Sequence, residues 1–76
     1  MKIIGLAICL DNEDYKASLD VRKIYPIAEP LSNDPKGYLR IIDESEEDYL
    51  YSEKAFALIN LSPKIEKQVK KSLSAV

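Results

Sequence analysis

Five carboxylates lie within six residues and form the densest group of reactive side chains in the sequence: Asp43, Glu44, Glu46, Glu47 and Asp48. Such a run can bind a divalent cation or dock a basic partner. A calcium loop of the EF-hand kind also needs a glycine at its sixth position and two flanking helices. This run has no glycine, and the alternating residues around it predict a β-hairpin. We expect a solvated turn here, with docking of a basic partner as the functional alternative and no metal.

Residues suited to catalysis are scarce. The 76 residues include no histidine, which is the commonest general base. The single cysteine, Cys9, therefore has no imidazole to activate its thiol, and we expect it to pack as a small apolar residue. A chain this short buries only about 60% of its unfolded surface and leaves little room for a reaction chamber. We expect a protein that binds rather than catalyses, without a cofactor.

The tyrosines are the second group with binding chemistry: Tyr15, Tyr25, Tyr38, Tyr49 and Tyr51. Grouped rings can form a cage for a cation or a stacking platform for single-stranded nucleic acid. A stacking platform needs a basic groove, yet the net charge is −2. The cations that could line such a groove have acidic neighbours: Arg22, Lys23, Lys36 and Arg40. Packing in the core and at its rim is the simpler role for these rings.

Short β-strands must position these side chains. The apolar and alternating patterns predict strands over 2–10, 21–28, 38–43, 48–51 and 55–60, with a 3₁₀ turn over 52–54. The polar residues 11–20 and the Pro- and Gly-rich residues 29–37 predict loops. Pro26 cannot donate to a ladder, so its strand is expected at a sheet edge or with a bulge. Tyr15 is either a lid over the core edge or an exposed contact, and Phe56 and Leu58 are expected to face inward.

The C-terminal segment 62–75 predicts an α-helix. Ser62 is suited to the N-cap and Pro63 to the first helical position. Apolar residues recur at helical spacing on one narrow face: Ile65, Val69, Leu73 and Val76. From residue 61 onward there are four lysines against one glutamate, a net of +3. We expect the helix to pack on the strands; contact with an anionic membrane, a partner helix or a second copy of the chain are the alternatives.

The segment LYSEKAFALI, residues 50–59, resembles the end of an SH3 domain, where a strand, a 3₁₀ turn and a final strand follow one another. In this resemblance Tyr51 takes an inward aliphatic position, Ser52 the proline, Ala55 the groove tyrosine and Phe56 the buried valine. SH3 domains that bind polyproline use that proline, that tyrosine and a tryptophan. This chain has none of the three, so the resemblance implies the barrel without the usual ligand.

A longer resemblance spans residues 12 to about 60. NEDYKASLDVRKIY followed by GYLRIIDESEEDYLY is similar to a group of small bacterial proteins of the form RKIY…GYLRVIDESGEDYLYP. The resemblance implies a bacterial, cytoplasmic origin and brings no activity. A lone cysteine also fits a reducing cytoplasm. The apolar run 3–10 ends in acidic residues and has no small-residue cleavage site, so neither a signal peptide nor a membrane span is expected.

The sequence thus predicts one mainly β domain over 1–76, an SH3-like barrel of about five short strands (about 2–60) with a C-terminal α-helix (about 62–75). We expect a non-catalytic protein-interaction module whose partner is another protein or a second copy of itself. The alternatives are a nucleic-acid-associated barrel, which the charge disfavours, and an accessory subunit of an enzyme. The predicted interaction surface comprises Tyr15, Arg22, Tyr38, Arg40, Glu46, Glu47 and Asp48.

Overall fold

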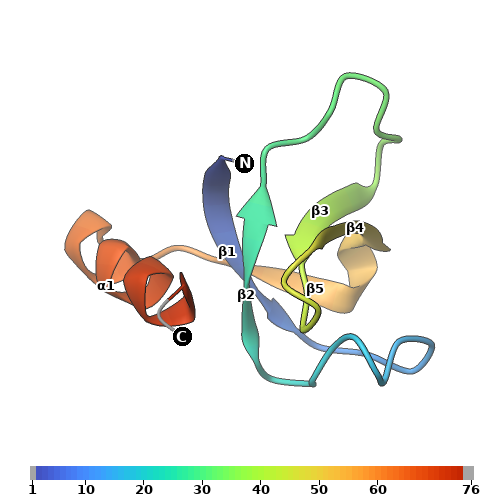
Figure 1. The fold of residues 1–76 in the computed structure, drawn as a ribbon, viewed down its shortest axis with the longest axis horizontal. Coiled ribbons are helices and arrows are strands. Elements are labelled where there is room, and N and C mark those ends of the chain that lie inside the picture. The colour runs from blue at the N-terminus through green and yellow to red at the C-terminus, as the bar shows by residue number, and fades with distance from the viewer. Residues whose placement is uncertain (1, 75–76) are drawn as a thin grey trace.

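Five antiparallel strands and one helix make up the fold in the computed structural model, which describes residues 2–74 (Figure 1). The strands are β1 (Ile3–Cys9), β2 (Ile24–Ala28), β3 (Tyr38–Ile42), β4 (Asp48–Ser52) and β5 (Phe56–Ile59). A 3₁₀ turn, η1 (Glu53–Ala55), joins β4 to β5, and α1 (Pro63–Ser74) follows. The predicted mainly β fold with a C-terminal helix is therefore confirmed.

The strands form one sheet in the order β4-β3-β2-β1-β5. Neighbours along the chain pair from β1 to β4, and β5 then returns to pair with β1, Cys9 lying opposite Phe56. The strands β4 and β5 are the two ends of this order. Within residues 2–74 the sheet is thus open and is not closed into a barrel by backbone pairing.

Pro26 lies in the middle of the sheet, so the expected edge position is wrong. β2 pairs with β1 along its whole length, with Leu6 opposite Pro26, whereas its register with β3 is a single pair, Ile27 with Ile41. A proline cannot donate a backbone hydrogen bond. The cost to β2 is small because its pairing with β3 is so short. A bulge does occur nearby, in β1 between Ile3 and Gly5.

One face of the sheet carries the core. Its buried cluster consists of Ala7, Cys9, Leu19, Tyr25, Ile27, Ile41, Tyr51 and Phe56. Phe56 faces inward as predicted, whereas Leu58 is 67% exposed, so the inward prediction for Leu58 is wrong. Leu19 is fully buried although it lies in the loop between β1 and β2. That loop therefore supplies part of the core instead of crossing the surface.

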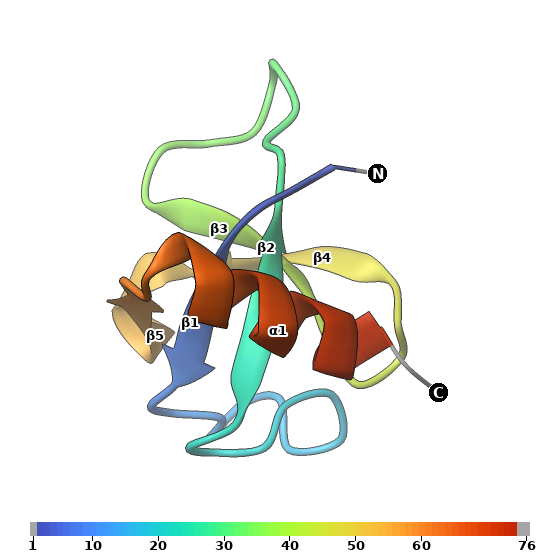
Figure 2. The same cartoon turned by 90° about the vertical axis from the view of Figure 1, so that its left-hand side faces the viewer.

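The helix α1 crosses the opposite face, over β1 and β2 (Figure 2). The hydroxyl of Ser62 accepts a hydrogen bond from the N–H of Ile65 at 3.4 Å, as expected of an N-cap. Val69 and Leu73 line a hollow together with Ile24 of β2, whereas Ile65 is 44% exposed. Of the predicted apolar stripe, Val69 and Leu73 are thus half-buried and Ile65 is exposed. The last predicted member, Val76, lies outside the described residues. The α-helix found in residues 2–74 is neither long nor apolar enough to cross a bilayer.

A left-handed backbone conformation ends the turn between β3 and β4. The N–H of Glu46 donates to the carbonyl of Asp43 at 2.9 Å, and the N–H of Asp43 donates to the carbonyl of Glu47 at 3.2 Å. Glu46 has φ of 68°. This is the type I turn followed by a left-handed residue that commonly closes short hairpins and favours glycine.

We predict that Glu46→Gly raises the free energy of unfolding by about 0.5–1 kcal/mol. Relief of left-handed strain, about 1–2 kcal/mol, outweighs the added flexibility of glycine in the unfolded chain. Urea unfolding followed by circular dichroism measures the change. Gly37→Ala is the matched control: Gly37 has φ of 85° and its added Cβ meets no atom within 4 Å, so strain alone should destabilise that variant by about 1 kcal/mol. A destabilised Glu46→Gly variant would contradict this account of the turn.

Candidate functional site

The loop between β1 and β2 is held closed at its base. The N–H of Cys9 donates to the carbonyl of Lys23 at 2.9 Å, and the N–H of Arg22 donates to the carbonyl of Cys9 at 2.6 Å. Within the loop the Asn12 side-chain amide donates to the carbonyl of Leu19 at 2.8 Å, beside the buried Leu19 side chain. These bonds and the buried leucine fix the loop, and with it Tyr15, to the sheet.

Glu44 joins this loop to the β3–β4 turn. Its N–H donates to the carbonyl of Ser18 at 3.0 Å. Its carboxylate forms an ion pair with Lys23 Nζ at 2.6 Å and accepts a hydrogen bond from the hydroxyl of Tyr25 at 2.5 Å. The Tyr25 hydroxyl in turn accepts from the N–H of Asp20 at 2.7 Å. Lys23, followed by the Tyr25 hydroxyl, lowers the pKa of Glu44.

Asp43 is a buried carboxylate with a complete set of partners. Only 5% of the residue is exposed. Its Oδ2 accepts from the hydroxyl of Tyr51 at 2.6 Å, and its Oδ1 accepts from the N–H and hydroxyl of Ser45 at 2.9 and 2.5 Å. Burial pushes the pKa of Asp43 up, but the bonds from Ser45 and Tyr51 prevail and lower it. Burial, followed by the Asp43 carboxylate, raises the pKa of the Tyr51 phenol to about 12.

Two hollows meet at Tyr15. The first, of about 350 Å³, is lined by Tyr15, Ser18, Asp43, Ser45, Tyr49, Leu50 and Tyr51. The second, of about 240 Å³, is lined by Asp11, Glu13, Asp14, Tyr15, Ser52, Lys54 and Ala55. Tyr15 packs edge-on against Tyr51, with ring centroids 4.9 Å apart, and stays 48% exposed. We call the residues around the two hollows the acidic tyrosine surface.

The structure brings together only part of the predicted interaction surface. Tyr15 lies between the two hollows, and Glu47 is adjacent because its carboxylate accepts from the hydroxyl of Tyr49 at 3.1 Å. Tyr38 is 50% exposed at the start of β3 but lines neither hollow. Arg22, at the base of the loop, has a left-handed φ of 67° and also lines neither.

Arg40 lies on the opposite face of β3 from the core residue Ile41. Its guanidinium is held by Asp34 at 2.6 Å and by Asp48 at 2.8 Å, and only 14% of its side chain is exposed. Hydrogen bonds from the Arg40 guanidinium, followed by smaller contributions such as its charge, lower the pKa values of both carboxylates. Glu46 lines a separate hollow beside α1. Arg40 and Asp48 are therefore tied into an ion-pair group that lines neither of the two hollows at Tyr15.

Three features of the site went unpredicted. The acids of residues 11–14 were expected only as part of a loop, Leu19 was not expected in the core, and Asp43 was expected in a solvated turn. A signal for the first existed, because Tyr15 follows these acids directly in the sequence. No local pattern marks Asp43, since its burial depends on the loop folding over it.

Metal-ligating side chains and the Cys9 thiol are groups within residues 2–74 that could bind a metal or act as a nucleophile. Among residues 2–74 no three metal-ligating side chains converge. Cys9 is buried, and burial raises the pKa of its thiol. Every buried side-chain nitrogen or oxygen in this range has a hydrogen-bond partner.

We predict that Tyr51→Phe lowers the free energy of unfolding by about 1–3 kcal/mol, because the buried Asp43 carboxylate loses a hydrogen bond. Urea unfolding at pH 7 measures the loss. The matched control is Tyr49→Phe, on the same strand: the Tyr49 hydroxyl bonds the exposed Glu47, so the urea midpoint should stay unchanged. Equal effects of the two variants would contradict the assigned role of Asp43.

Acid should destabilise the fold. Four carboxylates have lowered pKa values in the folded protein: Asp34, Asp43, Glu44 and Asp48. Their contribution to stability is present above the unfolded carboxyl pKa of about 4 and is lost as pH falls through the lower folded values. Urea midpoints measured from pH 7 to pH 2 should therefore fall below about pH 4, and should fall less in Tyr51→Phe. A midpoint independent of pH in that window would refute the prediction.

Comparisons of the chain with protein-family models, with curated proteins and with solved structures found no match.

Proposed function

We propose that this chain is a non-catalytic protein-interaction module that binds a basic, extended segment of a partner protein on the acidic tyrosine surface. One observation carries the proposal: two adjoining hollows share Tyr15 and combine tyrosine rings with carboxylates. Hollows of about 350 and 240 Å³ suit single side chains better than a large cofactor.

Lysine and arginine are the side chains that this chemistry favours. A cation over a tyrosine face within about 6 Å gains roughly 0.5–1 kcal/mol at an exposed site. Tyr15 and Tyr49, at 48% and 50% exposure, offer such faces. The acids of residues 11–14 lie on the same surface, and the first 60 residues carry a net charge of −5. This field attracts a basic segment before contact is made.

We also propose that the fold is of the SH3-like type. Three features support this: the strand order β4-β3-β2-β1-β5, the long folded loop between β1 and β2, and the 3₁₀ turn before β5. The second hollow contains Ser52 and Ala55, which stand where SH3 domains carry the groove proline and tyrosine. With carboxylates beside them, the ligand we propose is basic instead of polyproline. We further propose that the chain is related to the small bacterial proteins that it resembles and that it is cytoplasmic.

The nucleic-acid alternative has less support. Of its proposed cations, Arg40 is held by Asp34 and Asp48, and Lys23 is paired with Glu44. A phosphate would have to compete with these carboxylates. The second alternative, an accessory subunit of an enzyme, is compatible with the proposed surface. In that case the enzyme would supply the basic segment that binds there.

A titration with a basic peptide tests the proposal. The probe is a ten-residue peptide of alternating lysine and glycine, and the control replaces each lysine by glutamine. We expect amide chemical-shift changes around Tyr15 and Tyr49 with the lysine peptide only, and stronger binding at low salt, because screening falls with ionic strength.

Two variants localise the binding. Tyr15→Ala should weaken it by about twofold to fivefold, the loss of one exposed cation–π contact. Tyr38→Ala, an equally exposed tyrosine outside both hollows, should leave it unchanged. Equal losses in the two variants, or binding indifferent to salt, would reject the surface.

A further inference from the structure

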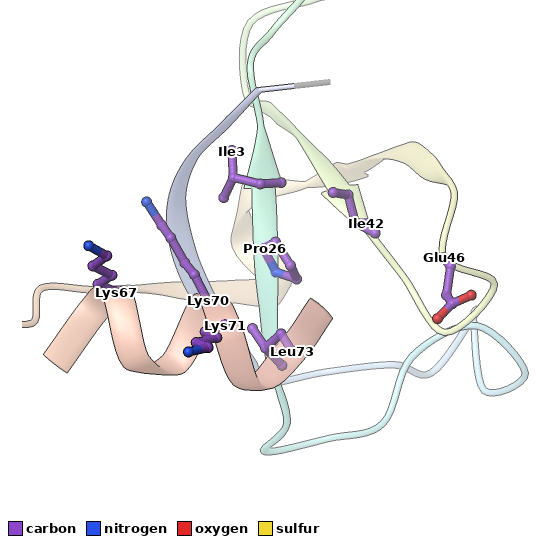
Figure 3. Close-up of a pocket in the computed structure, with 8 residues that line it drawn as sticks. All are labelled: Ile3, Pro26, Ile42, Glu46, Lys67, Lys70, Lys71 and Leu73. Carbon is purple, nitrogen blue, oxygen red and sulfur yellow. The ribbon is translucent and has the colours of Figure 1, made fainter. Parts of the chain in front are cut away.

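An apolar groove separates the C-terminal half of α1 from the sheet (Figure 3). Its volume is about 730 Å³, within the range of small-molecule sites. Ile3, Pro26 and Ile42, from three successive strands of the sheet, form the floor, and Leu73 of α1 points toward them. The groove lies on the sheet face opposite the core residue Ile41, so it is separate from the acidic tyrosine surface.

The groove exists because α1 covers the sheet incompletely. The helix packs on β2, and Val69 and Leu73 line a hollow there together with Ile24. Ile42 of β3 lies beyond the helix, toward the β3–β4 turn (Figure 3). Ile3, Pro26 and Ile42 are consequently only partly buried. Filling this space would remove their remaining apolar surface from water, which is favourable.

The two ends of the groove differ in charge. Lys67, Lys70 and Lys71 line it along the helix, while Glu46 lines it at the turn (Figure 3). Lys70 is paired with Glu66 at 2.8 Å. The segment from residue 61 onward has a net charge of +3. Lysine stems can cover apolar surface while their ammonium groups stay in water. The groove therefore has an apolar middle, a cationic end on α1 and an acidic end at the turn.

We propose that this groove binds a single-chain aliphatic carboxylate. Its chain lies over Ile3, Pro26 and Ile42, and its carboxylate lies at the lysine end, nearest Lys67. The head-group position is assigned to Lys67 because Lys70 is already paired. An aliphatic chain has no polar groups along its length, which suits a floor of aliphatic side chains. A peptide would bring backbone amides that need hydrogen-bond partners there. The charge of the helix selects an anionic head group over a cationic one.

The first test is a titration of the full chain with octanoate, decanoate and dodecanoate below their micelle concentrations. Heteronuclear NMR should show saturable shifts at Ile3, Ile42 and Leu73. The dissociation constant should fall by up to about tenfold for each added pair of methylenes, the effect of burying them. Dodecyltrimethylammonium, which has the same chain and a cationic head, should bind at least about fivefold more weakly than dodecanoate.

Two charge reversals on α1 locate the head group. Lys67 lines the groove and Lys64 does not, and both are exposed. Lys67→Glu should weaken dodecanoate binding by about fivefold and Lys64→Glu by less than twofold. Circular dichroism of both variants checks that the helix is kept. The proposal is overturned if no saturable binding occurs, if the cationic amphiphile binds as tightly, if the two variants behave alike, or if the shifts map to Tyr15 and Tyr49.

Discussion

The carboxylate of Asp43 is taken out of water at the point where the β3–β4 turn meets the loop between β1 and β2. Such a charge is costly to bury unless hydrogen bonds replace its hydration. Ser45 and Tyr51 supply those bonds at 2.5 to 2.9 Å. The turn that carries Ser45 and the strand that carries Tyr51 are thereby held in one arrangement. Glu44, the next residue, then bonds the backbone of Ser18 and fixes the loop to the turn.

This anchoring creates the acidic tyrosine surface. Leu19 fills the core below the loop, so the loop folds back over the sheet instead of extending into solvent. Tyr15 is then held against Tyr51 in a T-shaped contact and stays about half exposed. The acids of residues 11–14 come with the loop, and Tyr49 comes with β4. The binding chemistry we propose therefore depends on a structural carboxylate that need not itself contact a ligand.

The other face of the sheet is covered by α1, and this cover is incomplete. A sheet of five short strands presents apolar side chains on both faces, and the core cluster covers one of them. The helix α1 covers the second face with an apolar stripe in which Val69 and Leu73 are half-buried and Ile65 is exposed. The remaining apolar floor is the groove beside Ile42. The lysines on α1 keep this amphipathic region hydrated and set its charge.

Local features of this protein follow from its sequence alone. Alternation over residues 38–51 predicts two paired strands, and β3 and β4 pair with Ile41 opposite Tyr49. Ser62 and Pro63 predict where α1 begins, because N-cap and first-turn preferences act within a few residues. The 3₁₀ turn is displaced from its prediction by only one residue. Each of these depends on neighbours in the chain, so a local pattern contains the information.

The position of strands in the sheet, the burial of polar and loop residues, and the pairing of charges were decided only by the tertiary structure. Pro26 lies in a central strand because the sheet pairs β2 fully on one side and briefly on the other. Asp43 and Leu19 are buried because segments about 24 residues apart fold against each other. Arg40, expected on the interaction surface, is enclosed by two carboxylates, one of them from the loop before β3. Burial and ion pairing are properties of three-dimensional neighbours, and a residue's type does not say which neighbours it will have.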